Sequence, residues 1–388
     1  MPSPPHPKRD YRRPEPDRAA GALLGPLATD ALVGTPPTRP TIDPTLTHLI
    51  HTALQGALTT VTPTDPPPDP TARAWAHTLR TLVRTGQLPD HPGALEHTPD
   101  HDPHGVSWRA LTHTPPPAHD PARGAFACTH LVDAIKAAHR TGGHTAALYT
   151  AALAGARWGA SALPLQAMRH LSEHTDPHTP ITTALQAIAT RSDPTQWPQA
   201  PLNQEDRQRF TPFAVPHPLD PHVLLGNLAH LRHHPTATDA VVSLCRTHPH
   251  DAPHLPGPDW VRVWLHDAPG ANPNLHYTLD QAATAVATLR AEGKSVLVHC
   301  WAGASRTPAV AARYAITTLG APPLPTMTTL ITAVGGHLDN PTLSQAVAHL
   351  SGIDLPDPAH TLFNGDPPPR RPDLRTHTCH HHTPDPHR

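Results

Sequence analysis

The 388-residue sequence has few cysteines and no long apolar run. Its four cysteines, at positions 128, 245, 300 and 379, show neither close pairing nor CxxC spacing. That pattern excludes a disulfide scaffold and is typical of a reducing compartment. No stretch approaches the roughly 18 consecutive apolar residues of a membrane-spanning helix. Residues 1–13 are charged and rich in proline, without the apolar centre of a secretory signal. We therefore predict a cytoplasmic protein with no membrane partner.

Charge and aromatic side chains are also scarce, at 15% and 4% of the chain. Lysine supplies only three of the 29 basic residues, and the formal net charge is −2. Because no long basic run is present, the chain lacks the electrostatic surface of a dedicated nucleic-acid binder. No nucleic-acid partner is predicted.

Proline and histidine are abundant instead, with 54 and 35 residues. At roughly 150 residues per domain, the length suggests two domains. We predict a disordered tail at 1–16, an all-helical domain at 17–190, a linker at 191–208, an α/β domain at 209–360 and a disordered His-rich tail at 361–388. Both tails carry too little apolar content to offset chain entropy. The histidine run at 380–382 lies in such a tail, and no metal site is predicted.

The two predicted domains differ in their apolar patterns. Helices are predicted at 18–33, 71–84, 125–138, 145–158 and 164–171, with no β alternation between them. Later, β-branched apolar runs at 238–245, 260–265 and 295–299 are typical of buried strands, and 223–231 of a strand that runs into a helix. Residues 279–292, 307–319 and 326–334 have helical spacing. This alternation predicts an α/β domain with a central, mostly parallel sheet flanked by helices.

The segment 299–307 reads His-Cys-Trp-Ala-Gly-Ala-Ser-Arg-Thr and lies between a predicted strand and a predicted helix. Such a loop directs unpaired backbone N–H groups at one spot, where the helix dipole also favours an anion. Small residues let the backbone curl around a bound oxyanion, and the fork of Arg306 suits two of its oxygens. These groups should lower the pKa of Cys300, which predicts a thiolate nucleophile beneath a bound phosphate.

This C-x5-R loop, preceded by His299 and followed by Thr307, resembles the signature of the cysteine-dependent protein tyrosine and dual-specificity phosphatases. The likeness extends over roughly residues 212–350. It implies that Cys300 attacks phosphorus, that His299 orients the loop and that Thr307 stabilises the departing thiolate. The phosphate-binding residues that it implies are Trp301, Ala302, Gly303, Ala304, Ser305 and Arg306. This chemistry requires no metal or cofactor.

The resemblance also implies an aspartic acid on a mobile loop ahead of the cysteine, which protonates the leaving oxygen. Asp267 lies 33 positions before Cys300, next to several turn-forming residues, and is the predicted acid. Asp280, expected on the following helix, is the weaker candidate. Residues 338–345 resemble the family's late loop beside the active site, but ordinary capping or surface roles stay open for Asn340 and Gln345.

Residues 18–32 and 142–160 of the helical half resemble the opening helix and the late segment of ADP-ribosylglycohydrolases. Members of that family use paired aspartates to hold magnesium ions. Here His144 and Ala146 stand in place of the aspartates of the late motif, and only Asp30 matches the opening one. The resemblance therefore implies a shortened, inactive relative that packs against or regulates the second domain. ADP-ribose or an ADP-ribosylated protein stays open as a partner.

The sequence thus predicts a protein phosphatase that acts on phosphotyrosine in a phosphorylated protein substrate, with phosphoserine and phosphothreonine left open. Two alternatives remain. One keeps the chemistry but takes a phosphoinositide, a nucleotide or an RNA 5′-phosphate. The other is an ADP-ribose-recognising regulatory or binding protein in which the phosphatase domain is secondary.

Overall fold

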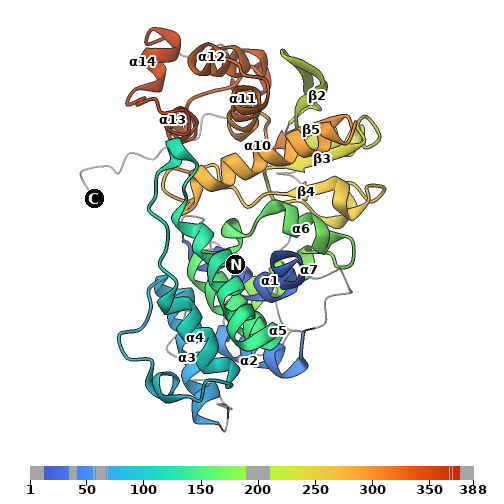
Figure 1. Ribbon diagram of the computed structural model, residues 1–388. Coiled ribbons are helices and arrows are strands. Elements are labelled where there is room, and N and C mark those ends of the chain that lie inside the picture. Colours follow the sequence, from blue (N-terminus) through green and yellow to red (C-terminus); the bar gives the residue numbers. More distant parts are fainter. Residues whose placement is uncertain are drawn as a thin grey trace, which may run out of the picture.

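The computed structural model describes residues 13–34, 42–55, 57, 67, 69–188, 210–366, 368 and 370–375. A helical region and an α/β region follow one another along the chain (Figure 1). In the view of Figure 1 the helical region forms the lower half, and the sheet with its helices forms the upper half. The predicted linker at 191–208 lies outside the described residues, as do most of the first tail and the end of the second.

The helical region contains long helices that begin at sequence-encoded caps. Its helices are α1 (Glu15–Val33), α2 (Pro44–Leu54), α3 (Pro70–Thr85), α4 (Pro103–His113), α5 (His130–Trp158), α6 (Leu165–Ser172) and α7 (His178–Ile188). Three of them start at an Asp-Pro pair, where Asp43, Asp69 or Asp102 accepts a backbone N–H bond and the proline needs no donor. Helices α2, α4 and α7 are additional to the helices predicted from the sequence.

Small residues hold α1 against α5, as the alanine- and glycine-rich sequence of α1 favours. A Cβ atom on Gly21 would lie 2.3 Å from the carbonyl oxygen of Gly155, so the two backbones touch. Helix α5 breaks at Gly143, whose φ of 72° and ψ of −165° are not helical. The break lies between the two helices predicted at 125–138 and 145–158.

The α/β region is built on one five-stranded sheet with the order β1-β2-β5-β3-β4. Its strands are β1 (Ala214–His217), β2 (Asp220–Asn227), β3 (Ala240–Ser243), β4 (Trp260–Arg262) and β5 (Val296–Cys300). Strand β1 pairs antiparallel with β2, and the other neighbours pair in parallel. The sheet is therefore mixed, with a parallel part that contains β5 between β2 and β3.

Helices cover both faces of this sheet. The helices of the α/β region are α9 (Leu228–His233), α10 (Leu275–Ala291), α11 (Arg306–Thr318), α12 (Pro323–Ala333), α13 (Pro341–His349), α14 (Pro358–Phe363) and α15 (Pro372–Arg375). Helices α10 and α11 pack together on one face, whereas Leu228 and Leu231 of α9 share a separate apolar cluster with Val241 and Leu297. Because β3 pairs in parallel with both β4 and β5, the carboxyl ends of these three strands meet at one edge of the sheet.

The described parts of the predicted tails differ from the prediction. Helix α1 already begins at Glu15, and residues 361–375 include the end of α14 and all of α15. Leu362 and Leu374 are buried, and Arg371 makes several hydrogen bonds to the domain. Apolar anchors spaced along a proline-rich segment, together with one arginine, therefore hold it in place.

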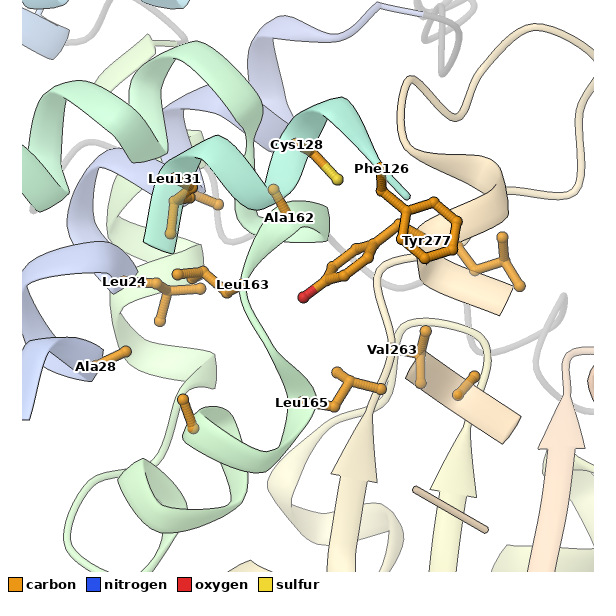
Figure 2. Close-up of a cluster of buried hydrophobic side chains, with 14 of the residues drawn as sticks. Leu24, Ala28, Phe126, Cys128, Leu131, Ala162, Leu163, Leu165, Val263 and Tyr277 are labelled. Atoms are coloured by element: carbon orange, nitrogen blue, oxygen red, sulfur yellow. The ribbon is translucent and has the colours of Figure 1, made fainter. Parts of the chain in front are cut away.

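One apolar core runs across the junction of the two regions. Figure 2 shows Tyr277 at the start of α10 and Val263 after β4 beside Phe126, Leu163 and Leu165 of the helical region. At the far end of α10, Arg169 donates two hydrogen bonds of 2.9 Å to the carboxylate of Glu292. Apolar burial and a bidentate ion pair therefore fix the helical region against α10.

Candidate active site

The loop of residues 300–306, here the cysteine loop, joins β5 directly to α11. Strand β5 ends at Cys300 and α11 begins at Arg306, so the loop starts in the middle of the parallel sheet. The backbone N–H of Gly303 donates to the Sγ atom of Cys300 across 3.2 Å. The loop thus curls around the sulfur, with at least one amide hydrogen directed at it.

The environment of Cys300 favours the thiolate. Its side chain is only 1% exposed. Burial alone would raise the pKa of Cys300, and the charge of Asp267 acts in the same direction. The charge of Arg306 and hydrogen bonds from the hydroxyl and amide of Thr307 outweigh both, so the pKa lies below its usual range. Cys300 is therefore a buried sulfur prepared for nucleophilic attack.

Arg306 is held with part of its guanidinium still available. Its Nη1 atom donates to the carbonyl oxygens of Leu244, at 2.7 Å, and Leu265, at 3.1 Å. Its Nε atom is buried, and among the described residues it has no hydrogen-bond partner. A buried donor without a partner is costly, and an oxyanion above Cys300 would satisfy it.

His299 supports the loop from below and does not reach its open side. The Nε1 atom of Trp260 donates to Ser243 Oγ at 2.9 Å, which leaves the Ser243 hydroxyl to donate to His299 Nε2 at 2.7 Å. The other nitrogen, Nδ1, then carries the hydrogen and donates to the carbonyl oxygen of Cys300 at 3.3 Å. Burial lowers the pKa of His299 to about 4, so the ring is neutral, as this network requires.

Asp267 lies beside the cysteine loop, on the segment 263–274 that joins β4 to α10 and is named here the acid loop. Ser305 Oγ donates to Asp267 Oδ1 at 2.9 Å, and Arg306 Nε lies 3.6 Å from Oδ2. The alternative candidate, Asp280, points elsewhere: it sits on α10 and pairs with Arg313. The structure therefore brings Asp267, and not Asp280, to Cys300 and Arg306.

The other residues predicted for phosphate binding have varied surroundings. The ring of Trp301 packs against the apolar cluster around Leu228 and Leu297. The carbonyl oxygens of Ala302 and Ala304 accept hydrogen bonds from Arg371 and from the amide of His337. The hydroxyl of Thr307, besides its bond to the cysteine, lies 3.4 Å from the carbonyl oxygen of Gly226.

Comparison with known families bears on this part of the chain. Residues 235–324 match the family model of the dual-specificity phosphatase catalytic domain. The match contains Asp267 and the whole cysteine loop, and it supports a phosphatase of the dual-specificity family. No curated protein and no solved structure matches the chain.

Gly303, the one glycine of the cysteine loop, has no room for a side chain. Its φ is +74°, and a Cβ atom would lie 2.7 Å from the carbonyl oxygen of Gly226. We expect Gly303→Ala to lower the free energy of unfolding by at least about 1–2 kcal/mol from the left-handed backbone alone. Turnover should fall as well, because the clash displaces the amide that faces Cys300. Thermal unfolding and p-nitrophenyl phosphate turnover check both effects.

Gly320 offers a matched control for that substitution. It has a φ of +68°, but among the described residues only its own chain neighbours come within 4 Å of the position that a Cβ atom would take. Gly320→Ala should therefore show the backbone cost without the loss of turnover. Equal turnover in the two variants would contradict the proposed role of the loop geometry.

Asn340 lies beyond the matched residues, yet it contacts Asp267. Its Nδ2 atom donates to Asp267 Oδ1 at 3.2 Å, and Thr342 Oγ1 donates to its Oδ1 at 2.6 Å, which fixes the orientation of the amide. Gln345, by contrast, donates to the carbonyl oxygen of Pro356 on the surface. The late loop thus brings one of its two candidate residues to the site.

We expect Asn340→Ala to slow turnover of a phosphotyrosine peptide about three- to tenfold, since a typical hydrogen bond contributes about 0.5–1.5 kcal/mol and this one orients Asp267. Steady-state kinetics of the purified variant measure the effect. Gln345→Ala is the control on α13, the helix that Asn340 precedes, and should keep wild-type rates. A wild-type rate for Asn340→Ala would show that Asp267 needs no support from Asn340.

Asp30 and His144, which belong to the two motif segments of the helical region, lie close together. His144 Nδ1 lies 3.6 Å from Asp30 Oδ1, so the two motif segments do meet in space. Among the described residues, no group of three or more His, Cys, Asp or Glu side chains is arranged to hold a metal ion. The phosphatase match does not extend to this region. Among all the described residues, in both regions, no helix is both long and apolar enough to cross a bilayer.

Proposed function

We propose that the protein is a phosphatase that hydrolyses phosphotyrosine in protein substrates through a phosphocysteine intermediate. The observation that carries the proposal is the buried Cys300, whose lowered pKa depends on Arg306, with the amide of Gly303 directed at its sulfur. Beside it, Asp267 supplies a carboxyl group for the leaving oxygen. A nucleophile, an oxyanion site and an acid are the three parts that phosphate ester cleavage needs.

The first step forms the bond between sulfur and phosphorus. The Cys300 thiolate attacks phosphorus while the loop amides and Arg306 hold the equatorial oxygens. The bond from phosphorus to the tyrosine oxygen breaks, and Asp267 gives its proton to that oxygen. The products of this step are the dephosphorylated side chain, phosphocysteine and an ionised Asp267.

The second step regenerates the enzyme. Asp267 takes a proton from a water molecule, whose oxygen attacks phosphorus as the bond to sulfur breaks. The hydroxyl of Thr307, which hydrogen-bonds the sulfur, stabilises the departing thiolate. Inorganic phosphate leaves, and both Cys300 and Asp267 return to their starting protonation states. His299 acts on this cycle only through the carbonyl of Cys300.

A substrate panel tests the proposal. We expect the full chain to release phosphate from p-nitrophenyl phosphate and from a phosphotyrosine peptide. A phosphoserine peptide, a phosphoinositide and a 5′-phosphorylated oligonucleotide separate the protein-tyrosine assignment from the broader and non-protein alternatives. Preference for one of the last two substrates would overturn the proposed substrate class but keep the chemistry. No hydrolysis of any of the five would overturn both.

A further inference from the structure

Arg371 contacts the cysteine loop from the opposite side to Cys300. Its Nη2 atom donates to the carbonyl oxygen of Ala302 at 2.6 Å, and its Nη1 atom donates to that of Val334 at 2.8 Å. The guanidinium is largely buried: its carbon lies 3.7 Å from the ring centroid of Phe213, and Asp373 accepts from Nε at 3.1 Å. Arg371 therefore joins the cysteine loop, the end of α12 and the start of the sheet at one point.

The geometry of one peptide unit relates this contact to the sulfur. The described residues contain no cis peptide bond, so the C=O bond of Ala302 and the N–H bond of Gly303 lie in one peptide plane and point in opposite directions. Arg371 holds the carbonyl oxygen at one edge of that plane. The N–H at the opposite edge donates to Cys300 Sγ at 3.2 Å. A rotation of this peptide would break both hydrogen bonds together.

We propose that Arg371 is a positioning residue for the phosphatase reaction, which locks the Ala302–Gly303 peptide so that its amide stabilises the Cys300 thiolate and the bound phosphate. The inference rests on the proposed function of the cysteine loop. We assign no substrate contact to Arg371, because each of its three guanidinium nitrogens already donates, to Asp373, Val334 and Ala302. The segment after α14 is thus part of the catalytic unit.

The pKa of Cys300 provides a readout that a merely structural role would not change. Alkylation of Cys300 by iodoacetamide is followed against pH in the full chain carrying Cys379→Ser. Burial raises the pKa of both Cys128 and Cys245 to about 12, so these thiols do not interfere. We expect Arg371→Gln and Arg371→Lys each to raise the apparent pKa of Cys300 by about one unit, which is a tenfold loss of thiolate. Protection of Cys300 by inorganic phosphate should weaken in parallel.

Two comparisons keep the test decisive. Arg370→Gln changes the neighbouring arginine, which pairs with the exposed Asp339, and should leave the pKa of Cys300 unchanged. Arg371→Lys keeps the positive charge near Phe213 and covers the case in which Arg371→Gln does not fold. A low wild-type pKa that neither folded Arg371 variant alters would overturn the positioning role. An ordinary thiol pKa in the wild type would instead overturn the proposed function.

A separate set of contacts links the helical region to the acid loop. At the end of this loop, Asn274 Nδ2 donates to the carbonyl oxygen of Trp158 at 2.7 Å and to Ser161 Oγ at 2.8 Å. The Ser161 hydroxyl in turn donates to the buried carboxylate of Asp17 at 2.6 Å. Just before the loop, Arg262 pairs with Asp176 at 3.0 Å. Both ends of the segment that carries Asp267 are therefore fastened to the helical region.

We infer that the helical region positions the general acid through the hydrogen-bond chain Asp17–Ser161–Asn274. This inference also rests on the proposed function, and it predicts an effect that depends on the leaving group. Asn274→Ala should slow turnover of a phosphotyrosine peptide about tenfold but that of p-nitrophenyl phosphate, whose leaving group needs little acid, about twofold at most. In an Asp267→Asn background the same substitution should have no further effect on the peptide, because the acid is already absent.

The control for this experiment weakens the contact between the helical region and α10 at a point far from the acid loop. Glu292→Gln removes the carboxylate that pairs with Arg169 at the far end of α10, and it should leave the ratio of the two rates unchanged. Equal slowing on both substrates by Asn274→Ala, or full additivity with Asp267→Asn, would overturn the positioning role. An inactive wild-type protein would instead overturn the proposed function.

Discussion

Cys300→Ser abolishes turnover of p-nitrophenyl phosphate and of a phosphotyrosine peptide, with an expected loss of about 10⁴-fold or more. Serine differs from cysteine here by one atom, but its hydroxyl does not ionise in this environment, and the positive surroundings of Arg306 cannot make it an alkoxide. The loop amides and the guanidinium stay in place, so the variant should still bind inorganic phosphate. Steady-state kinetics and a phosphate titration measure the two properties on one preparation.

Cys245→Ser is the matched control for that experiment. Cys245 is also buried, near Arg306 and Cys300, but burial raises its pKa to about 12, so it remains a thiol. The substitution should leave turnover close to the wild-type rate. Loss of activity in Cys245→Ser together with its retention in Cys300→Ser would show that the nucleophile is Cys245, beyond the end of β3.

Asp267→Asn separates the acid from the rest of the site. Asparagine keeps the hydrogen-bond acceptor for Ser305 and the shape of the side chain, but it has no proton to give. A positioned general acid contributes about 10²–10⁴-fold to rate, so turnover of a phosphotyrosine peptide should fall within this range. The effect on p-nitrophenyl phosphate should be much smaller, because p-nitrophenolate leaves without protonation. Phosphate affinity should change little.

Asp280→Asn tests the competing acid in the same assay. Asp280 pairs with Arg313 on α10, so its loss should affect stability more than the dependence on the leaving group. A peptide rate that stays normal in Asp267→Asn but falls in Asp280→Asn would move the acid to the helix.

The cysteine loop was predictable from the sequence because its parts are contiguous. A buried strand, a run of small residues, Arg306 and a helix start follow one another without interruption, and the physical demands of an oxyanion site act on those neighbours. Asp267 was predictable, given the family resemblance, from its separation of 33 positions from Cys300 in the sequence and from the turn-forming residues near it. The Gly-Gly break in α5 followed from the same local logic.

The contacts of the supporting residues were not predictable from local patterns because they join distant segments, and only the family resemblance pointed to Asn340. Asn340 lies 73 positions from Asp267, and Arg371 lies 69 positions from Ala302, in a stretch where proline and low apolar content predict a tail. Nothing local to either residue indicates its partner. The starts of α2 and α4, in contrast, carry a local signal, because each is an Asp-Pro pair that is typical of a helix N-terminus.

Capture of the covalent intermediate tests the central proposal most directly. The full chain is mixed with p-nitrophenyl phosphate, quenched within milliseconds in acid and digested. The mass of the peptide that contains Cys300 is then measured by mass spectrometry. We expect a phosphoryl group on Cys300 in the wild-type protein and none in Cys300→Ser. Phosphate release in the absence of that adduct, or a phosphoryl group on any other residue, would contradict it.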